Sequence, residues 1–199
     1  MNGVLAKPLG EIFYSRPPEV VARDLLGQVL VRRLDGAEIG GPIVETEAYD
    51  GPEDQASHAR FGVTRRNAVM YGPPGRAYIY FTYGMHWCLN VVCGPEGSPS
   101  AVLIRAIEPT IGLEIISSRR DGRPAKEWTN GPAKLCKALG VDGSLLGADL
   151  TDPCGDLFIL ESEATAARAV RQTPRIGIGY AGEPWRSMPW RFVLDAPAD

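Results

Sequence analysis

The segment PIVETEAY, residues 42–49, places two carboxylates and a phenol at alternate positions. The segment is typical of a β-strand, in which alternate side chains point to the same face. Ile43, Glu45, Glu47 and Tyr49 would then share one face of the strand. Two carboxylates beside a tyrosine can perform acid–base chemistry if that face lines a cleft. The alternative is a polar face turned to the solvent.

Aromatic side chains form a second group. Residues 77–83, AYIYFTY, indicate another strand, with Tyr78 and Tyr80 on one face and Phe81 and Tyr83 on or near the other. Rings that converge on a pocket bind a flat heterocycle by stacking. Ordinary packing within a sheet is the alternative.

Three further polar residues need an explanation. Arg105 lies in the apolar run AVLIRAI and Asn90 in CLNVV, while His58 ends the polar loop PEDQASH. A polar side chain in an apolar strand must find a partner or reach a cleft, because burying it unpaired is costly. Arg105 and Asn90 are therefore either site residues or satisfied structural groups. With two histidines and no Cys-x-x-Cys pair, the chain offers no zinc-ligand spacing.

The charge of the chain is unevenly distributed. The 199 residues carry a net charge of −3, but residues 60–137 hold 11 basic and 5 acidic side chains, a net of +6. The flanking segments, 1–59 and 138–199, carry −5 and −4. A basic middle between acidic ends is typical of a surface that faces a polyanion, and chance clustering is the alternative.

Mostly extended segments must position these side chains. We expect helices at 19–26, 108–120 and 132–139, and strands at 28–34, 42–49, 77–83, 86–93, 101–107, 156–160, 174–180 and 190–194. Strands and helices do not alternate regularly, which favours an α+β fold with a mainly antiparallel sheet. No apolar run approaches the ~18 residues of a membrane span.

Four tracts resemble a known family: GPIVETEAYDGPEDQASH, RNAVMYGPPGRAYIYFTYGMHWCLNVV, VLIRAIEP and NGPAKLCKAL. Their order and spacing are similar to those of the alkyladenine (methylpurine) DNA glycosylases, from about residue 17 to residue 194. The resemblance implies one domain over residues 1–199, similar to the C-terminal domain of formyltransferases. That domain would have a curved antiparallel sheet, surrounding helices and a β-hairpin that protrudes into the minor groove of DNA.

The family's activity would be that of a monofunctional glycosylase. Such an enzyme flips alkylated or deaminated purines out of duplex DNA and hydrolyses the N-glycosidic bond, which leaves an abasic site and starts base excision repair. The implied substrates are 3-methyladenine, 7-methylguanine, hypoxanthine and ethenoadenine. The resemblance implies no metal and no organic cofactor. We expect damaged double-stranded DNA as the partner, no membrane contact, a monomer, and a location in the cytoplasm, at the nucleoid in a bacterial cell.

The resemblance also assigns roles to residues of this chain. Glu47 matches the general base, which the strand pattern alone does not distinguish from Glu45, and Arg105 matches an arginine near the attacking water. The base-binding positions are Tyr49 on one side of the flipped base and His58 and Tyr80 on the other. Asn90 matches the side chain that disfavours the guanine 2-amino group, and the backbone of Ala48 and of His58 should also face the base. Tyr83 matches the wedge that fills the gap in the duplex. We expect Arg65, Arg66, Arg105 and Lys134 to contact phosphates. His86 and Trp87 depart from the family's Tyr and Phe.

Other functions are compatible with parts of the sequence. The segment RIGIGYAG, residues 175–182, suggests a helix-hairpin-helix glycosylase, although that motif needs flanking helices. A non-catalytic nucleic-acid-binding module would use the aromatic face without chemistry. A lyase would need an amine nucleophile, and lysine is scarce here, so we expect hydrolysis only.

Overall fold

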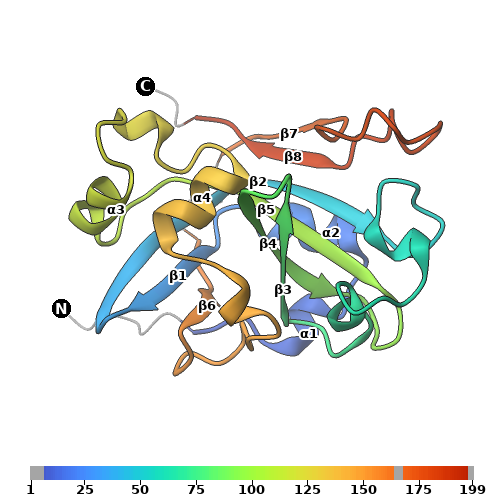
Figure 1. Cartoon of the computed structure of the whole chain (residues 1–199), viewed down its shortest axis with the longest axis horizontal. Helices are drawn as coiled ribbons and strands as arrows, with labels where there is room; N and C mark the ends of the chain where they lie inside the picture. The colour runs from blue at the N-terminus through green and yellow to red at the C-terminus, as the bar shows by residue number, and fades with distance from the viewer. Residues whose placement is uncertain (1–6, 164–167, 197–199) are drawn as a thin grey trace.

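The computed structural model describes residues 7–163 and 168–196. Over these residues it is an α+β fold built on one curled antiparallel sheet, as predicted (Figure 1). The strand order is β3-β4-β5-β2-β1-β6, and β8 pairs with β2 and with β7. The strands are β1 (Val29–Leu34), β2 (Ala37–Asp50), β3 (Ala77–Thr82), β4 (His86–Cys93), β5 (Ser100–Ile107), β6 (Leu157–Leu160), β7 (Val170–Thr173) and β8 (Arg191–Leu194).

Short helices surround the sheet. The α-helices are α1 (Glu11–Tyr14), α2 (Pro18–Asp24), α3 (Leu113–Arg119) and α4 (Pro132–Leu139), and the 3-10 turns are η1 (His58–Phe61), η2 (Ala68–Tyr71), η3 (Ala125–Glu127) and η4 (Gly143–Leu145). Helix α2 packs against β2 and β5, and α4 packs against β4 and β5. None of the described helices is long and apolar enough to cross a membrane.

Strand β2 is longer than predicted and carries the site. The tight turn at Asp35 and Gly36, both with positive φ, returns the chain directly into β2 at Ala37. The first half of β2 pairs with β1, and the second half pairs with β5 and β8. The register shifts at Glu45, which is a β-bulge. A bulge interrupts the alternation of faces, and Ile43 packs in the main core with Ala48 instead of sharing the face of the carboxylates.

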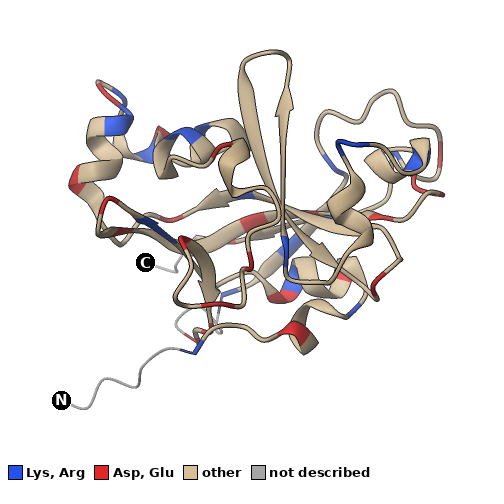
Figure 2. Cartoon of the chain, turned by 60° about the horizontal axis from the view of Figure 1, so that its bottom comes forward, with Lys and Arg blue, Asp and Glu red and all other residues tan. Residues whose placement is uncertain are grey.

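The hairpin β3–β4 projects from the sheet. Thr82 pairs with His86, so Tyr83, Gly84 and Met85 form its tip. Tyr83 and Gly84 both have positive φ, which closes this tight turn. In Figure 2 the hairpin stands out as a ribbon without a charged residue. The Tyr83 side chain at its tip is 84% exposed.

Two of the predicted elements were wrong. Residues 174–180 form bends and turns, because Pro174 and the glycines interrupt the strand pattern and Gly177 has positive φ. The edge strand β7 instead precedes them. These turns also remove the helix-hairpin-helix alternative, since no described helix flanks residues 175–182. Helix α3 is shorter than the predicted 108–120, because it begins only after Gly112, whose φ is positive.

Candidate active site

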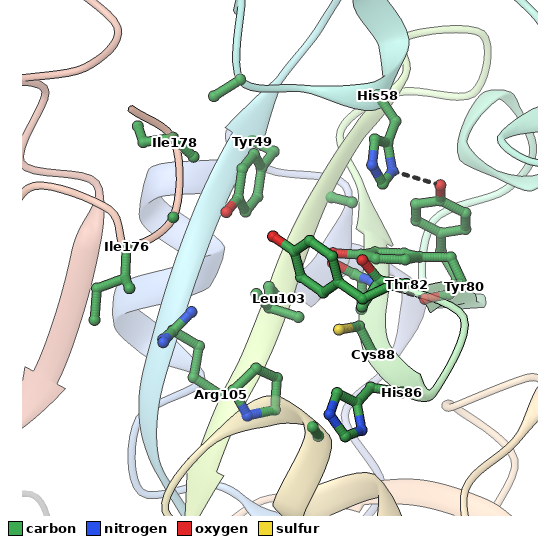
Figure 3. A pocket seen from close by; sticks show the side chains of 18 of the residues that line it. Tyr49, His58, Tyr80, Thr82, His86, Cys88, Leu103, Arg105, Ile176 and Ile178 are labelled. Carbon is green, nitrogen blue, oxygen red and sulfur yellow. Dashed lines mark hydrogen bonds between the residues drawn. The ribbon is translucent and has the colours of Figure 1, made fainter. Parts of the chain in front are cut away.

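A cavity of about 430 Å³ opens between the hairpin β3–β4, strand β2, and the loops around residues 56–66 and 176–180 (Figure 3). Seven of the predicted site residues line it: Tyr49, His58, Arg66, Tyr80, Tyr83, Asn90 and Arg105. Glu47, Ala48, Arg65 and Lys134 are not part of its wall. The sheet and two distant loops therefore assemble one pocket.

Glu47 lies directly behind this wall. Its side chain is fully buried, and both carboxylate oxygens accept hydrogen bonds. Oε2 accepts from the Tyr49 hydroxyl at 2.8 Å and from Arg105 Nη1 at 3.1 Å, and Oε1 accepts from the Ile176 backbone N–H at 2.7 Å. Burial raises the pKa of Glu47 above its usual range, against the lowering effects of Arg105 and of these hydrogen bonds. The carboxylate is thus more basic than an exposed one and fixed in direction.

Glu45 serves a different purpose on the same face of β2. Its Oε1 accepts hydrogen bonds from Arg105 Nε and from Arg191 Nε, both at 2.6 Å. Arg105 therefore bridges the two carboxylates, and its guanidinium is held beside Glu47 by Glu45. The arrangement distinguishes the two acids, because only Glu47 contacts Tyr49.

Aromatic rings form two opposing sides of the cavity. Figure 3 shows Tyr49 on one side and His58 and Tyr80 on the other. The rings of His58 and Tyr80 meet edge to face, with centroids 4.6 Å apart. His58 Nδ1 lies 2.8 Å from the Tyr78 hydroxyl. Burial, together with the charges of Arg66 and Arg60, lowers the pKa of His58 to about 4, so its ring is neutral near pH 7.

Asn90 of strand β4 also lines the cavity. Its Nδ2 donates to the backbone oxygen of Tyr78 at 2.9 Å, which fixes the orientation of the amide. No described residue donates a hydrogen bond to its Oδ1, and the side chain is 4% exposed. The amide oxygen is therefore an available acceptor in the pocket.

The predicted phosphate contacts occupy different positions. The guanidinium of Arg66 lies 4.8 Å from the centroid of the Tyr80 ring and lines the cavity. Arg65 beside it is exposed. Lys134 lies in the first turn of α4, where its Nζ donates to Asn130 Oδ1 at 2.8 Å. Only Arg66 of these three belongs to the pocket itself.

A buried ion pair that local sequence patterns did not predict supports the pocket. Arg175 Nη1 and Nη2 donate to Asp54 Oδ2 and Oδ1 at 2.5 and 2.9 Å, and both side chains are fully buried. Arg175 Nη1 also donates to the backbone oxygen of Ala48 at 2.8 Å, and its guanidinium lies 4.8 Å from the centroid of the Tyr49 ring. This one side chain thus contacts β2 directly beside Glu47.

Asp54 connects its ion pair with Arg175 to the side of the cavity that carries His58. Its carboxylate accepts from the backbone N–H groups of Asp50 and Ala56, which shapes the loop that leads to His58. Arg175 in turn precedes Ile176, whose N–H holds Glu47. In the sequence, Arg175 begins the apolar, glycine-rich run RIGIG, much as Arg105 lies within the apolar run AVLIRAI.

The arrangement can bind a flat, neutral or cationic ring system between aromatic walls, with a buried carboxylate at one side to accept a proton. Among the residues that the structure describes, no cluster of His, Cys, Asp and Glu could hold a metal ion.

Comparisons with known proteins agree on one family. The family model described as methylpurine-DNA glycosylase (MPG) matches residues 12–198. Three similar relatives share the printed name "Putative 3-methyladenine DNA glycosylase". The relative from Desulfitobacterium hafniense is 45% identical over 95% of this chain and 96% of its own length. Those from Anaeromyxobacter dehalogenans and Methanocella arvoryzae are 48% and 49% identical, over 96% and 90% of this chain and 84% and 88% of their own lengths.

Proposed function

This chain belongs to the methylpurine-DNA glycosylase family, and we propose that it flips damaged purines out of duplex DNA and hydrolyses their N-glycosidic bond with Glu47 as general base. The observation that carries the proposal is the fully buried Glu47 carboxylate, held by Tyr49 and Arg105 at the side of an aromatic cavity. A module that only binds nucleic acid would gain nothing from this carboxylate, because a negative charge there opposes a polyanion.

Flipping is required because the sugar carbon C1′ of a stacked nucleotide is inaccessible in a duplex. In the proposal the extruded base stacks between Tyr49 and the pair His58 and Tyr80, while the amide of Asn90 faces its edge. Tyr83, exposed at the tip of the hairpin, fills the space that the base leaves in the duplex. Unstacking costs a few kcal/mol, and the contacts of Tyr83 with the duplex and of the base with the pocket together offset this cost.

The chemical step follows from the position of Glu47. The bond between C1′ and the base nitrogen breaks, and its electron pair leaves with the base, which generates an oxocarbenium-like sugar. A water oxygen bonds to C1′, and its proton passes to the Glu47 carboxylate. Arg105, whose guanidinium lies 3.1 Å away, favours the ionised form of that carboxylate against the opposing effect of burial. An alkylated, cationic base leaves as a neutral molecule and needs no proton.

We propose hydrolysis without lyase activity. A lyase forms a Schiff base through an amine, and no lysine is found among the described residues that line the cavity. Borohydride should therefore trap no covalent adduct with DNA. We also propose that the protein acts as a monomer on damaged duplex DNA in the cytoplasm, at the nucleoid in a bacterial cell.

The substrate range is tested with four duplexes that carry 3-methyladenine, 7-methylguanine, hypoxanthine or ethenoadenine. We expect release of the free base and an intact abasic site, seen as a strand that breaks only on heating in alkali. The cationic lesions should react faster than hypoxanthine, because their bases are better leaving groups. Binding to all four duplexes without release of any base would instead establish the non-catalytic alternative.

A further inference from the structure

One buried polar side chain next to the cavity has no role in the mechanism proposed above. Asn67 follows the exposed residues 60–66, but is itself only 1% exposed. Its side chain makes all four of the hydrogen bonds that a carboxamide can make. A buried and fully bonded carboxamide fixes the groups around it, because any movement would leave a buried polar atom unsatisfied.

The four hydrogen bonds connect both ends and the middle of one loop. Asn67 Nδ2 donates to the backbone oxygens of His58 at 3.0 Å and Gly62 at 2.8 Å. Its Oδ1 accepts from the Thr64 backbone N–H at 2.6 Å and from the Thr64 hydroxyl at 2.9 Å. Gly62 has a positive φ, which lets the chain turn back toward Asn67. Residues 58–67 therefore form a closed loop around this carboxamide.

Packing contributes little to the order of this loop. Residues 60–66 are all exposed, so burial of apolar surface does not hold them in place. The Arg66 guanidinium lies 4.8 Å from the centroid of the Tyr80 ring, but a long side chain leaves its main chain considerable freedom. The Asn67 side chain instead bonds directly to main-chain atoms of three residues.

The loop brings two residues to the wall of the cavity. His58 stands at its beginning and Arg66 directly precedes Asn67, and both line the cavity. Figure 3 shows the His58 ring on the side of the cavity opposite Tyr49. The His58 ring is held separately, because its Nδ1 lies 2.8 Å from the Tyr78 hydroxyl. His58 is thus fixed at two points, its main chain by Asn67 and its ring by Tyr78.

We propose that Asn67 is a positioning residue of the base-binding site. By holding the main chain at His58, it sets the distance between the two aromatic walls and so the width of the slot for the extruded base. The inference rests on the proposed function for what enters the slot. A stacked base needs both walls at contact distance, because dispersion attraction falls steeply when a gap opens. Displacement of His58 would weaken binding of the base and leave contacts with the rest of the duplex unchanged.

The first test needs no DNA. The chain has two histidines, so NMR can follow the ring of His58, and His58→Gln identifies its signals. In the unmodified protein, burial and the charges of Arg66 and Arg60 lower the pKa of His58 to about 4. Asn67→Ala should raise this pKa toward the ordinary 6.5, because a displaced ring becomes hydrated and moves away from both guanidinium groups.

Two further variants accompany Asn67→Ala. Gln172→Ala truncates an exposed carboxamide on β7 and should leave the pKa of His58 at about 4. Thr64→Val removes the exposed hydroxyl that donates to Asn67, and should raise the pKa by less than Asn67→Ala does. Thermal unfolding verifies that each variant folds, and Thr64→Val decides the test if Asn67→Ala does not. An unchanged pKa of His58 in the folded variants would overturn the inference.

The second test measures binding of the base in the Glu47→Gln background, which keeps the base attached to the sugar. Two duplexes are compared, one with ethenoadenine and one with a base-less sugar analogue at the same position. Asn67→Ala should weaken the first complex by roughly 10-fold, as expected for the loss of one stacking contact, and leave the second unchanged. Gln172→Ala should change neither. An equal effect of Asn67→Ala on both duplexes, including none, would overturn the inference.

Failure of the proposed function gives a different result. A Glu47→Gln protein that released the base at the rate of the unmodified protein would refute Glu47 as general base. The titration of His58 in the absence of DNA would still decide whether Asn67 positions this wall of the cavity.

Discussion

The guanidinium of Arg175 lies over the ring of Tyr49, 4.8 Å from its centroid, while both of its Nη atoms hold the buried carboxylate of Asp54. Ile176, which follows Arg175, and the loop from Asp54 to His58 reach opposite sides of the cavity. The pocket therefore depends on an ion pair whose members are 121 positions apart in the sequence.

Arg175→Met should destabilise the protein by about 3–5 kcal/mol, because it leaves the Asp54 charge buried and unpaired. The double variant Arg175→Met with Asp54→Leu should recover much of that loss, since no unpaired charge remains. Arg171→Met, which breaks the exposed pair with Asp195, is the control and should cost less than about 1 kcal/mol. Urea unfolding measures all three, and equal losses for Arg175→Met and Arg171→Met would contradict the account.

Tyr83→Ala should weaken excision without weakening the fold. The ring is 84% exposed, so its removal leaves no cavity. Losing one stacking contact of about 1–2 kcal/mol should reduce affinity for a damaged duplex by roughly 10-fold. Ile12→Ala, which truncates a side chain that is 87% exposed on α1, should change neither property. A Tyr83→Ala protein that binds damaged DNA as tightly as the control would remove the wedge from the mechanism.

Substitution of two arginines distinguishes the role of Glu45 from that of Glu47. Arg105 and Arg191 both donate to Glu45 at 2.6 Å, but only Arg105 also reaches Glu47. A general base must be deprotonated, so excision should rise with pH through a pKa above the ordinary value of glutamate. Arg105→Gln removes a charge that lowers this pKa, and should move the acid limb of the profile to higher pH. Arg191→Gln should move it less, and equal shifts would argue against Glu47 as the base.

His58 predicts how stability depends on pH. Its pKa is lowered to about 4 in the folded protein, so the unfolded chain binds its proton more readily between about pH 6.5 and pH 4. The contribution of His58 to the free energy of unfolding is fully present above the pKa of His58 in the unfolded chain. It is lost as the pH falls from about 6.5 to about 4, by on the order of 2–3 kcal/mol. His58→Gln should show a shallower fall in unfolding free energy over the same range. Identical pH slopes for the two proteins would be inconsistent with a neutral, buried ring.

Local patterns were sufficient to predict much of the fold and part of the site. Period-two alternation placed Glu45, Glu47 and Tyr49 on one face, and Asp35-Gly36 predicted the hairpin that begins β2. The register shift at Glu45 was not visible, because a bulge depends on which strands pair on either side. Ile43 was therefore assigned to the wrong face.

The long-range parts of the site could not be predicted from local patterns. The contact between Ile176 N–H and Glu47 joins residues 129 positions apart. The buried Asp54 looked like one polar residue among many in a loop. Charge counting located the basic middle of the chain, but which of its cations lack ion pairs depends on tertiary packing.

The role of Glu47 as the general base is tested by the single-turnover excision rate of Glu47→Gln on a duplex that carries ethenoadenine, with Glu45→Gln as the matched control. Affinity for the same duplex is measured in parallel, so that a loss of binding is not mistaken for a loss of chemistry. Since general base catalysis contributes about 10²–10⁴-fold, we predict a loss of at least 100-fold for Glu47→Gln with affinity retained, and a smaller loss for Glu45→Gln. A Glu47→Gln protein that excises the base at the rate of the unmodified protein would contradict the account.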